Sequence, residues 1–298
     1  MPEASRYEYD MHPNLAHQRD PSNRNASIGI RVRAMALSFP QLGPKQQRGS
    51  KPRCHLLTHG PSGEVARRLT ALIQPWGEVH STDRWMPRGF EQCAEAQLHS
   101  AAALLPDRRH RDILKNWWLA AAENNSTTPN IDLASTCDVL GNTGMLLIEA
   151  KAHDYELKKE EAGKNLAEDC SDDSKRNHEQ IGLAIEAANA SLSKETGHRW
   201  ALSRDSRYQM SNRFAWAWKL TELGMPVILA YLGFVGCEEM REGVRQRPMR
   251  DHDDWRELVL RHSAPLFSDG IWNRQWRVNG QLFIPLILTS DQLLKLGA

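Results

Sequence analysis

Apolar and polar positions divide the chain into two regions. Residues 1–51 carry few large apolar side chains and show neither helical nor strand periodicity. They cannot bury enough surface to order themselves, so we expect a flexible N-terminal extension. Apolar positions recur from residue 52 to 298, a length that suits a single domain.

Apolar residues recur at helical spacing in several segments of this domain. One of these helices ends before Pro106, and another ends at Gly224 with Pro226 beyond, which are strong stop signals. The predicted helices are Glu64–Ile73, Phe90–Leu105, Asp112–Ala122, Asn177–Leu192, Ser206–Leu223 and Asp253–Arg261.

Shorter apolar runs predict strands. Ile131–Leu140 and Met145–His153 flank the turn at residues 141–144, an arrangement typical of a β-hairpin. Val227–Phe234 is almost continuously apolar, as expected at the centre of a sheet. Cys54–Thr58 and Leu282–Leu288 are the other strand candidates. The pattern therefore predicts an α/β fold, with a mixed central sheet and a β-hairpin core flanked by helices.

Composition narrows the setting. The net charge is +1, so nucleic acid could be attracted only by a local basic patch. The five cysteines include no CxxC pair, which argues against a zinc site or a disulfide framework and favours the cytoplasm. No apolar run approaches roughly 18 residues, so we expect no membrane partner.

The sharpest chemical feature ends the second strand of the hairpin. Met145–Ile148 is aliphatic and leads directly into Glu149-Ala150-Lys151. Alternation puts Glu149 and Lys151 on one face of the strand. Charges on an apolar strand are costly unless they face water, each other or a metal. An ordinary solvated pair is the alternative interpretation.

An acidic residue on the partner strand completes a candidate metal site. Asp132 can approach Glu149 across the hairpin, and Asp138 is an alternative first acid closer to the turn. Two carboxylates suit Mg²⁺. Phosphodiester hydrolysis needs an activated water and a Lewis acid on the phosphate, which Lys151 and such a metal could supply.

The pattern Ile-Asp-Leu (131–133), a hairpin and Leu-Leu-Ile-Glu-Ala-Lys (146–151) resembles the PD-(D/E)XK, or restriction-endonuclease-like, nuclease superfamily, and phrases such as Tyr-Leu-Gly-Phe (231–234) resemble a bacterial family within it. The resemblance covers about residues 90–235. It implies a core of a helix, three antiparallel strands, a helix and a further strand.

The resemblance also implies Mg²⁺ or Mn²⁺ as the cofactor and DNA or RNA as the partner. It implies a catalytic Glu on the upstream helix, for which Glu95 or Glu91 is the match. Two features depart from the pattern: Asn130 and Ile131, not Pro, precede Asp132, and the spacing from Asp132 to Glu149 is long.

Other polar residues are candidate contacts to nucleic acid. His153 extends the face of Glu149 and Lys151, and Asn177 opens the helix that follows the hairpin. Arg204 and Arg213 belong to a basic and aromatic segment that could hold phosphates and bases. The simpler interpretations are a surface histidine, a helix cap at Asn177 and core packing of the aromatic residues.

The sequence therefore predicts a metal-dependent nuclease centred on Asp132, Glu149 and Lys151. A nuclease-like fold retained as a catalytically inactive module for nucleic acid or protein is the main alternative, and a small-molecule enzyme is a third. The sequence does not distinguish DNA from RNA as the substrate, or endonuclease from exonuclease action, and it does not give the oligomeric state.

Overall fold

The computed structural model describes residues 49–121, 127–237 and 247–291. The predicted flexible extension, residues 1–51, therefore lies outside the described residues except for its last three positions. Lys51 already begins a helix, one residue before the predicted start of the domain at residue 52.

A mixed six-stranded sheet forms the centre of the fold, in the order β1-β2-β3-β4-β6-β5. The parallel pairs are β3 with β4 and β4 with β6, and the other neighbours are antiparallel. The strands are β1 (Trp85–Met86), β2 (Leu133–Val139), β3 (Asn142–Lys151), β4 (Val227–Phe234), β5 (Trp276–Val278) and β6 (Gln281–Ser290).

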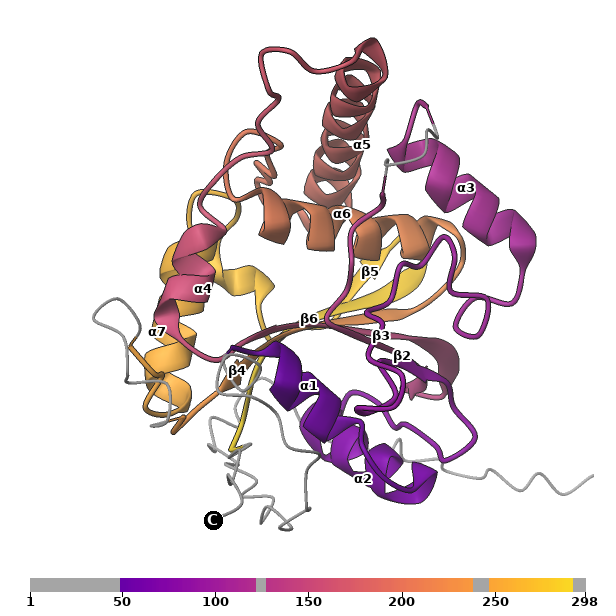
Figure 1. The fold of residues 1–298 in the computed structure, drawn as a ribbon, viewed down its shortest axis with the longest axis vertical. Coiled ribbons are helices and arrows are strands. Elements are labelled where there is room, and N and C mark those ends of the chain that lie inside the picture. The colour runs from indigo at the N-terminus through magenta and orange to yellow at the C-terminus, as the bar shows by residue number, and fades with distance from the viewer. Residues whose placement is uncertain (1–48, 122–126, 238–246, 292–298) are drawn as a thin grey trace, which may run out of the picture.

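Helices cover both faces of the sheet (Figure 1). On one face lie α1 (Lys51–Leu57) and α2 (Ser62–Ile73), which pack on the inward residues of β2 and β3. The opposite face carries α3 (Arg108–Trp118), α5 (Asp172–Thr196), α6 (Tyr208–Glu222) and α7 (His252–Ser263). The short α4 (Asp154–Lys159) follows β3, and a 3₁₀ turn spans Asp269–Ile271.

Burial on both faces explains the apolar character of the central strands. Every residue of β4 is buried, as expected for a strand that lies between two parallel neighbours and two layers of helices. The sequence predictions of an α/β fold, a mixed sheet, the β2–β3 hairpin and a central β4 are confirmed.

Two predicted elements are wrong. Cys54–Thr58, predicted as a strand, belongs to α1 and the residue after it, because Pro52 in the first turn favours a helical start and the segment buries one face on the sheet. Phe90–Leu105, predicted as a helix, consists of turns and isolated bridges. Ala96 pairs with Ile131, so the backbone follows the sheet edge despite the helical spacing of its apolar residues.

Within the described ranges, no helix is both long enough and apolar enough to cross a membrane.

Candidate active site

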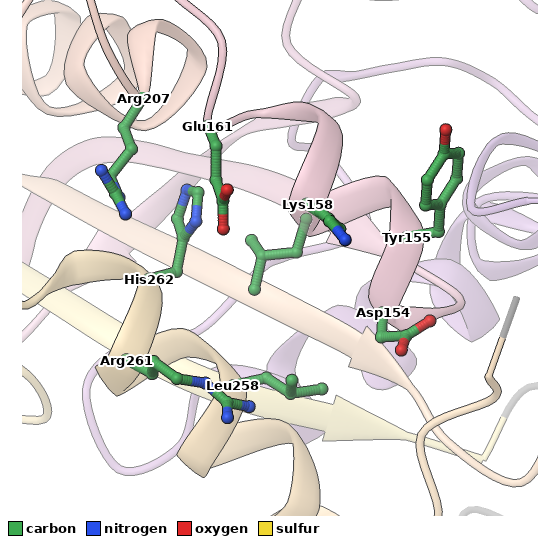
Figure 2. A pocket seen from close by; sticks show the side chains of 9 residues that line it. Asp154, Tyr155, Lys158, Glu161, Arg207, Leu258, Arg261 and His262 are labelled. Atoms are coloured by element: carbon green, nitrogen blue, oxygen red, sulfur yellow. The ribbon is translucent and has the colours of Figure 1, made fainter. Parts of the chain in front are cut away.

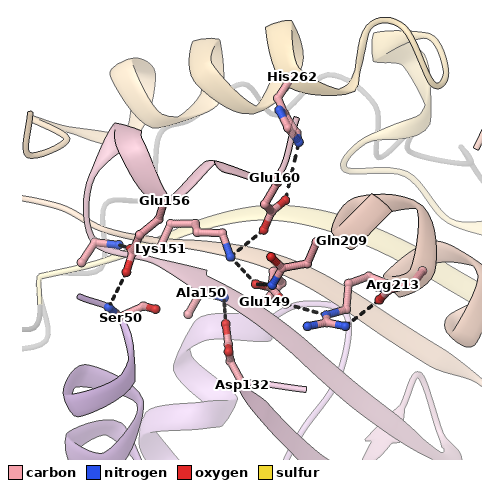
Figure 3. Close-up of polar contacts among 12 residues, drawn as sticks. Ser50, Asp132, Glu149, Ala150, Lys151, Glu156, Glu160, Gln209, Arg213 and His262 are labelled. Atoms are coloured by element: carbon pink, nitrogen blue, oxygen red, sulfur yellow. Dashed lines mark hydrogen bonds and ion pairs between the residues drawn. The ribbon is translucent and has the colours of Figure 1, made fainter. Parts of the chain in front are cut away.

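Charged side chains from the hairpin meet at the end of β2 and β3 away from the turn. The antiparallel register pairs Leu133 with Ile148, so the next pair outward brings Asp132 opposite Glu149. Lys151 lies two residues beyond Glu149 and therefore on the same face of β3, which is the face covered by α6. The structure thus brings together the three residues on which the sequence prediction centres (Figure 3).

Glu149 is fully buried and is held by three donors. Arg213 donates to Oε2 at 2.5 Å, Gln209 donates to Oε1 at 2.6 Å, and Lys151 pairs with the same Oε1. Burial opposes ionisation of this carboxyl group, but the charges of Arg213 and Lys151 outweigh it and lower the pKa of Glu149 to about 2. Glu149 is therefore an anion at neutral pH.

Lys151 is shared between two carboxylates. Besides Glu149 it contacts Glu160 Oε1 at 2.6 Å, and Glu160 Oε2 lies 3.5 Å from Nε2 of His262 on α7. Burial favours the neutral amine, but Glu149 and Glu160 outweigh it and raise the pKa of Lys151. Lys151 is a cation that keeps a counter-ion even when Glu149 is engaged elsewhere.

Asp132 behaves differently from Glu149. Its Oδ2 accepts the backbone N–H of Ala150 at 2.8 Å. Burial of the carboxyl group, reinforced by the nearby charge of Glu149, raises the pKa of Asp132 well above its usual range, although Lys151 and Arg213 act against this. Asp132 and Glu149 thus repel each other, and a cation between them would relieve that repulsion.

The centre is enclosed. Glu149 has no exposed surface and Lys151 is 4% exposed. Glu156 of α4 accepts the backbone N–H of Ser50 at 3.1 Å through Oε1 and that of Ala152 at 2.6 Å through Oε2. These bonds fasten the start of α1 and the start of α4 to the end of β3 (Figure 3).

Two further predicted acids lie elsewhere. Glu95, predicted on a helix, lies in the irregular segment and pairs with Lys51 at 2.9 Å beside a cavity of about 420 Å³. The charges of Glu95 and Asp132 both raise the pKa of Lys51, so Glu95 borders the centre without reaching Glu149. Asp138 lies at the turn end of β2 and accepts the N–H of Gly141 at 2.6 Å. It is therefore too far along the strand to join Glu149.

The predicted nucleic-acid contacts have structural partners. His153 is buried at the start of α4, 4.0 Å from Glu156. Asn177 exchanges hydrogen bonds with the backbone of Ala121 and is not a cap, because α5 begins earlier. Arg204 bonds Asp205 and a backbone carbonyl, and Arg213 faces the buried Glu149. The structure does not bring these four residues together as a basic surface.

The sequence prediction missed three residues of the centre, Gln209, Glu160 and His262, and it gave Arg213 a different role. Gln209 and Arg213 stand four residues apart on α6, so both reach Glu149 from one side of a helix that is otherwise mostly buried and apolar. That spacing was a usable signal. Glu160 and His262 gave none, because each is an isolated polar residue. Only the packing of α4 and α7 brings Glu160 to Lys151 and His262 to Glu160.

The donors at the centre fit a hard divalent cation. Asp132 and Glu149 supply two carboxylates, the number with which Mg²⁺ is commonly held when it keeps part of its water shell. In the portion of the chain that is described, no group of three or more His, Cys, Asp or Glu side chains is arranged around a metal position. A cation here would have to share Glu149 with Lys151 and Arg213.

Comparisons with known proteins identify no relative. No family model matches the chain, and neither curated proteins nor solved structures give a significant match. Function therefore has to be inferred from the centre itself.

Proposed function

We propose that this protein is a metal-dependent phosphodiester hydrolase that acts on nucleic acid, with Asp132, Glu149 and Lys151 as its reactive centre. The observation that carries the proposal is the hairpin register, which places Asp132 opposite Glu149 with Lys151 on the same face as Glu149. Two carboxylates and an amine at the same end of the hairpin are the groups that metal-assisted phosphate hydrolysis needs.

Each residue has a role that follows from its contacts. Asp132 and Glu149 would hold Mg²⁺ or Mn²⁺, which supplies Lewis acidity towards the scissile phosphate and a more acidic water. Lys151, kept positive by Glu160, stabilises the negative charge that develops on the phosphate oxygens and orients the attacking water. Arg213 and Gln209 keep the Glu149 carboxylate ionised and fixed in direction.

The arrangement of the strands supports the restriction-endonuclease-like resemblance. An antiparallel β1-β2-β3 set is followed by β4 in parallel contact with β3, which is compatible with the three antiparallel strands, helix and further strand of that core. One departure concerns the upstream acid, because Glu95 lies on an irregular segment and not on a helix. The upstream glutamate role is therefore left out of the proposal.

One observation favours an inactive interaction module as the second candidate. Both oxygens of Glu149 are already engaged by Arg213, Gln209 and Lys151, as expected of a buried network that only holds the fold. Under this alternative Glu149 does not bind metal.

Cleavage assays with matched variants separate the two candidates. Labelled single- and double-stranded DNA and RNA are incubated with Mg²⁺ or Mn²⁺, and wild type is compared with Asp132→Asn. Asn keeps the shape of Asp and removes its charge, so the variant stays folded and loss of cutting reports on chemistry. Lys151→Ala is less informative alone, because it leaves two buried carboxylates without their cation, at a cost of about 3–5 kcal/mol.

We expect metal-dependent cutting by wild type and by Asp138→Asn, which makes the same change at the far end of β2, and at least a hundredfold less by Asp132→Asn. Equal cutting by Asp132→Asn and wild type would contradict the proposed centre. If no protein cuts and calorimetric titration detects no Mg²⁺ or Mn²⁺ binding to wild type, the module is the better description.

A further inference from the structure

A second cavity lies next to the centre. Its volume is about 680 Å³, and α4, the start of α6 and α7 form its walls (Figure 2). His262 lines it and also contacts Glu160, which holds Lys151. Glu160 and His262 therefore stand between this cavity and the centre.

Positive side chains dominate the charge of the cavity. Lys158, Arg207 and Arg261 line it, and none has an ion-pair partner among residues 49–121, 127–237 and 247–291. Of the two acids in the lining, Asp154 is paired with Arg247, at 3.7 Å. Among the described residues that line the cavity, this leaves Glu161 as the one acid without an ion pair, opposite three cations.

Arg207 is the strongest indication of a ligand. Its Nε is buried and has no hydrogen-bond partner in the described structure, which is costly for a charged donor. In Figure 2 its guanidinium points into the space beside His262 and Glu161. A guanidinium presents paired donors that match two oxygens of a phosphate. A phosphate held by the rest of the guanidinium would compensate the charge of this side chain, whose Nε has no other partner in the described structure.

We propose that this cavity binds a phosphate-bearing stretch of the nucleic-acid chain, with Lys158, Arg207 and Arg261 as the phosphate contacts. The inference rests on the proposed function, because it is the shared wall with the centre that points to the same substrate. A cavity of this size admits about one nucleotide. Lys158 and Arg261 lie outside the basic segment predicted from sequence, whereas Arg207 lies between its members Arg204 and Arg213.

The test measures binding without cleavage. Fluorescence anisotropy of labelled single-stranded DNA and RNA is recorded in EDTA over a range of salt concentrations. Lys158→Gln and Arg261→Gln remove exposed side chains, so they leave the fold intact. Arg256→Gln is the matched control, because Arg256 is exposed on the same helix, α7, but does not line the cavity.

Each cavity variant is expected to lower the salt slope of log K by about 0.7, which corresponds to about fivefold weaker binding at 0.1 M salt. Arg207→Gln should behave alike, with a thermal melt to confirm folding. Binding by Lys158→Gln and Arg261→Gln that matches Arg256→Gln in strength and slope would overturn the inference. A mononucleotide that competes as strongly as an oligonucleotide would also overturn it, in favour of a free nucleotide.

The binding test of the cavity and the cleavage test of the proposed function can fail independently. Loss of binding in the cavity variants, with cleavage unaffected by Asp132→Asn, would retain the cavity and discard the centre. Cleavage abolished by Asp132→Asn, with unchanged binding by the cavity variants, would do the reverse.

Discussion

Asp132 and Glu149 face each other across one hairpin, yet their pKa values are shifted in opposite directions. Glu149 is surrounded by donors and has a pKa of about 2, whereas burial and the charge of Glu149 raise the pKa of Asp132. Environments that shift the pKa values of two neighbouring carboxyl groups in opposite directions are typical of functional sites. In the absence of a bound cation, ionisation of Asp132 destabilises the fold.

Asp132→Asn is therefore expected to stabilise the protein at neutral pH in EDTA. A raised folded-state pKa means that the contribution of the Asp132 proton to stability is complete below the unfolded value, ~3.9, and is lost as pH rises through the folded value. The stability of Asp132→Asn relative to wild type should therefore increase with pH between the unfolded-state and folded-state pKa values of Asp132. Thermal melts between pH 3 and pH 8 measure it.

Asp138→Asn is the control for this prediction, since the same substitution there leaves the centre untouched. A wild type that is as stable as Asp132→Asn at neutral pH would show that water or a counter-ion already relieves the repulsion at Asp132.

The sequence specified the residues of the hairpin but not their partners. The alternation of side chains and the apolar stem are local, so Glu149, Lys151 and Asp132 could be placed in advance. Glu160 and His262 could not, because the contact of Glu160 with Lys151 and that of His262 with Glu160 depend on the packing of α4 and α7, which no local pattern encodes.

Among the elements, β4 and α7 fit each other through a glycine. A Cβ on Gly233 would lie 2.6 Å from the ring of Trp255, which is fully buried on α7. That close approach fixes the height of α7 above the sheet. Because α7 also carries His262, the fit between strand and helix sets the distance from His262 to Glu160.

Gly233→Ala is expected to destabilise the fold by about 1–3 kcal/mol, because a ring and a helix must move to admit one methyl group. Gly63→Ala on α2 is the control, since its Cβ would meet nothing within 4 Å, and it should cause no loss. Urea denaturation of both variants gives the comparison. Equal stability of Gly233→Ala and wild type would mean that α7 shifts freely.

For helices and strands, the predictions from sequence succeeded where the apolar pattern was long and failed where tertiary contacts determined the local structure. Apolar periodicity located α5, α6 and α7 to within a few residues. The apolar spacing of Phe90–Leu105 matched a helix, but pairing of Ala96 with Ile131 drew that segment onto the sheet edge. The place of β6 between β4 and β5 could not be read from the sequence, because strand order is a long-range property.

For the molecule as a whole, a bound cation should appear as added stability. Anything that binds only the folded state stabilises it, by about 2.7 kcal/mol at a concentration 100 times the dissociation constant. We expect Mg²⁺ or Mn²⁺ to raise the Tm of wild type and of Asp138→Asn, and EDTA to reverse the rise.

Asp132→Asn should show little or no such increase in Tm, because one of the two carboxylates has lost its charge. An increase of the same size in Asp132→Asn and in wild type would place the cation elsewhere on the surface.

The burial of Glu149 has a consequence for the rate of the reaction. A carboxylate with no exposed surface cannot meet a polymer until the side chains around it move, and the hydrogen bonds from Gln209 and Arg213 of α6 are among the contacts that must part. Opening would then precede every encounter, and its frequency would set the ceiling on turnover. Weakening the packing of α6 over Glu149 should therefore speed this opening step, although it also destabilises the closed fold.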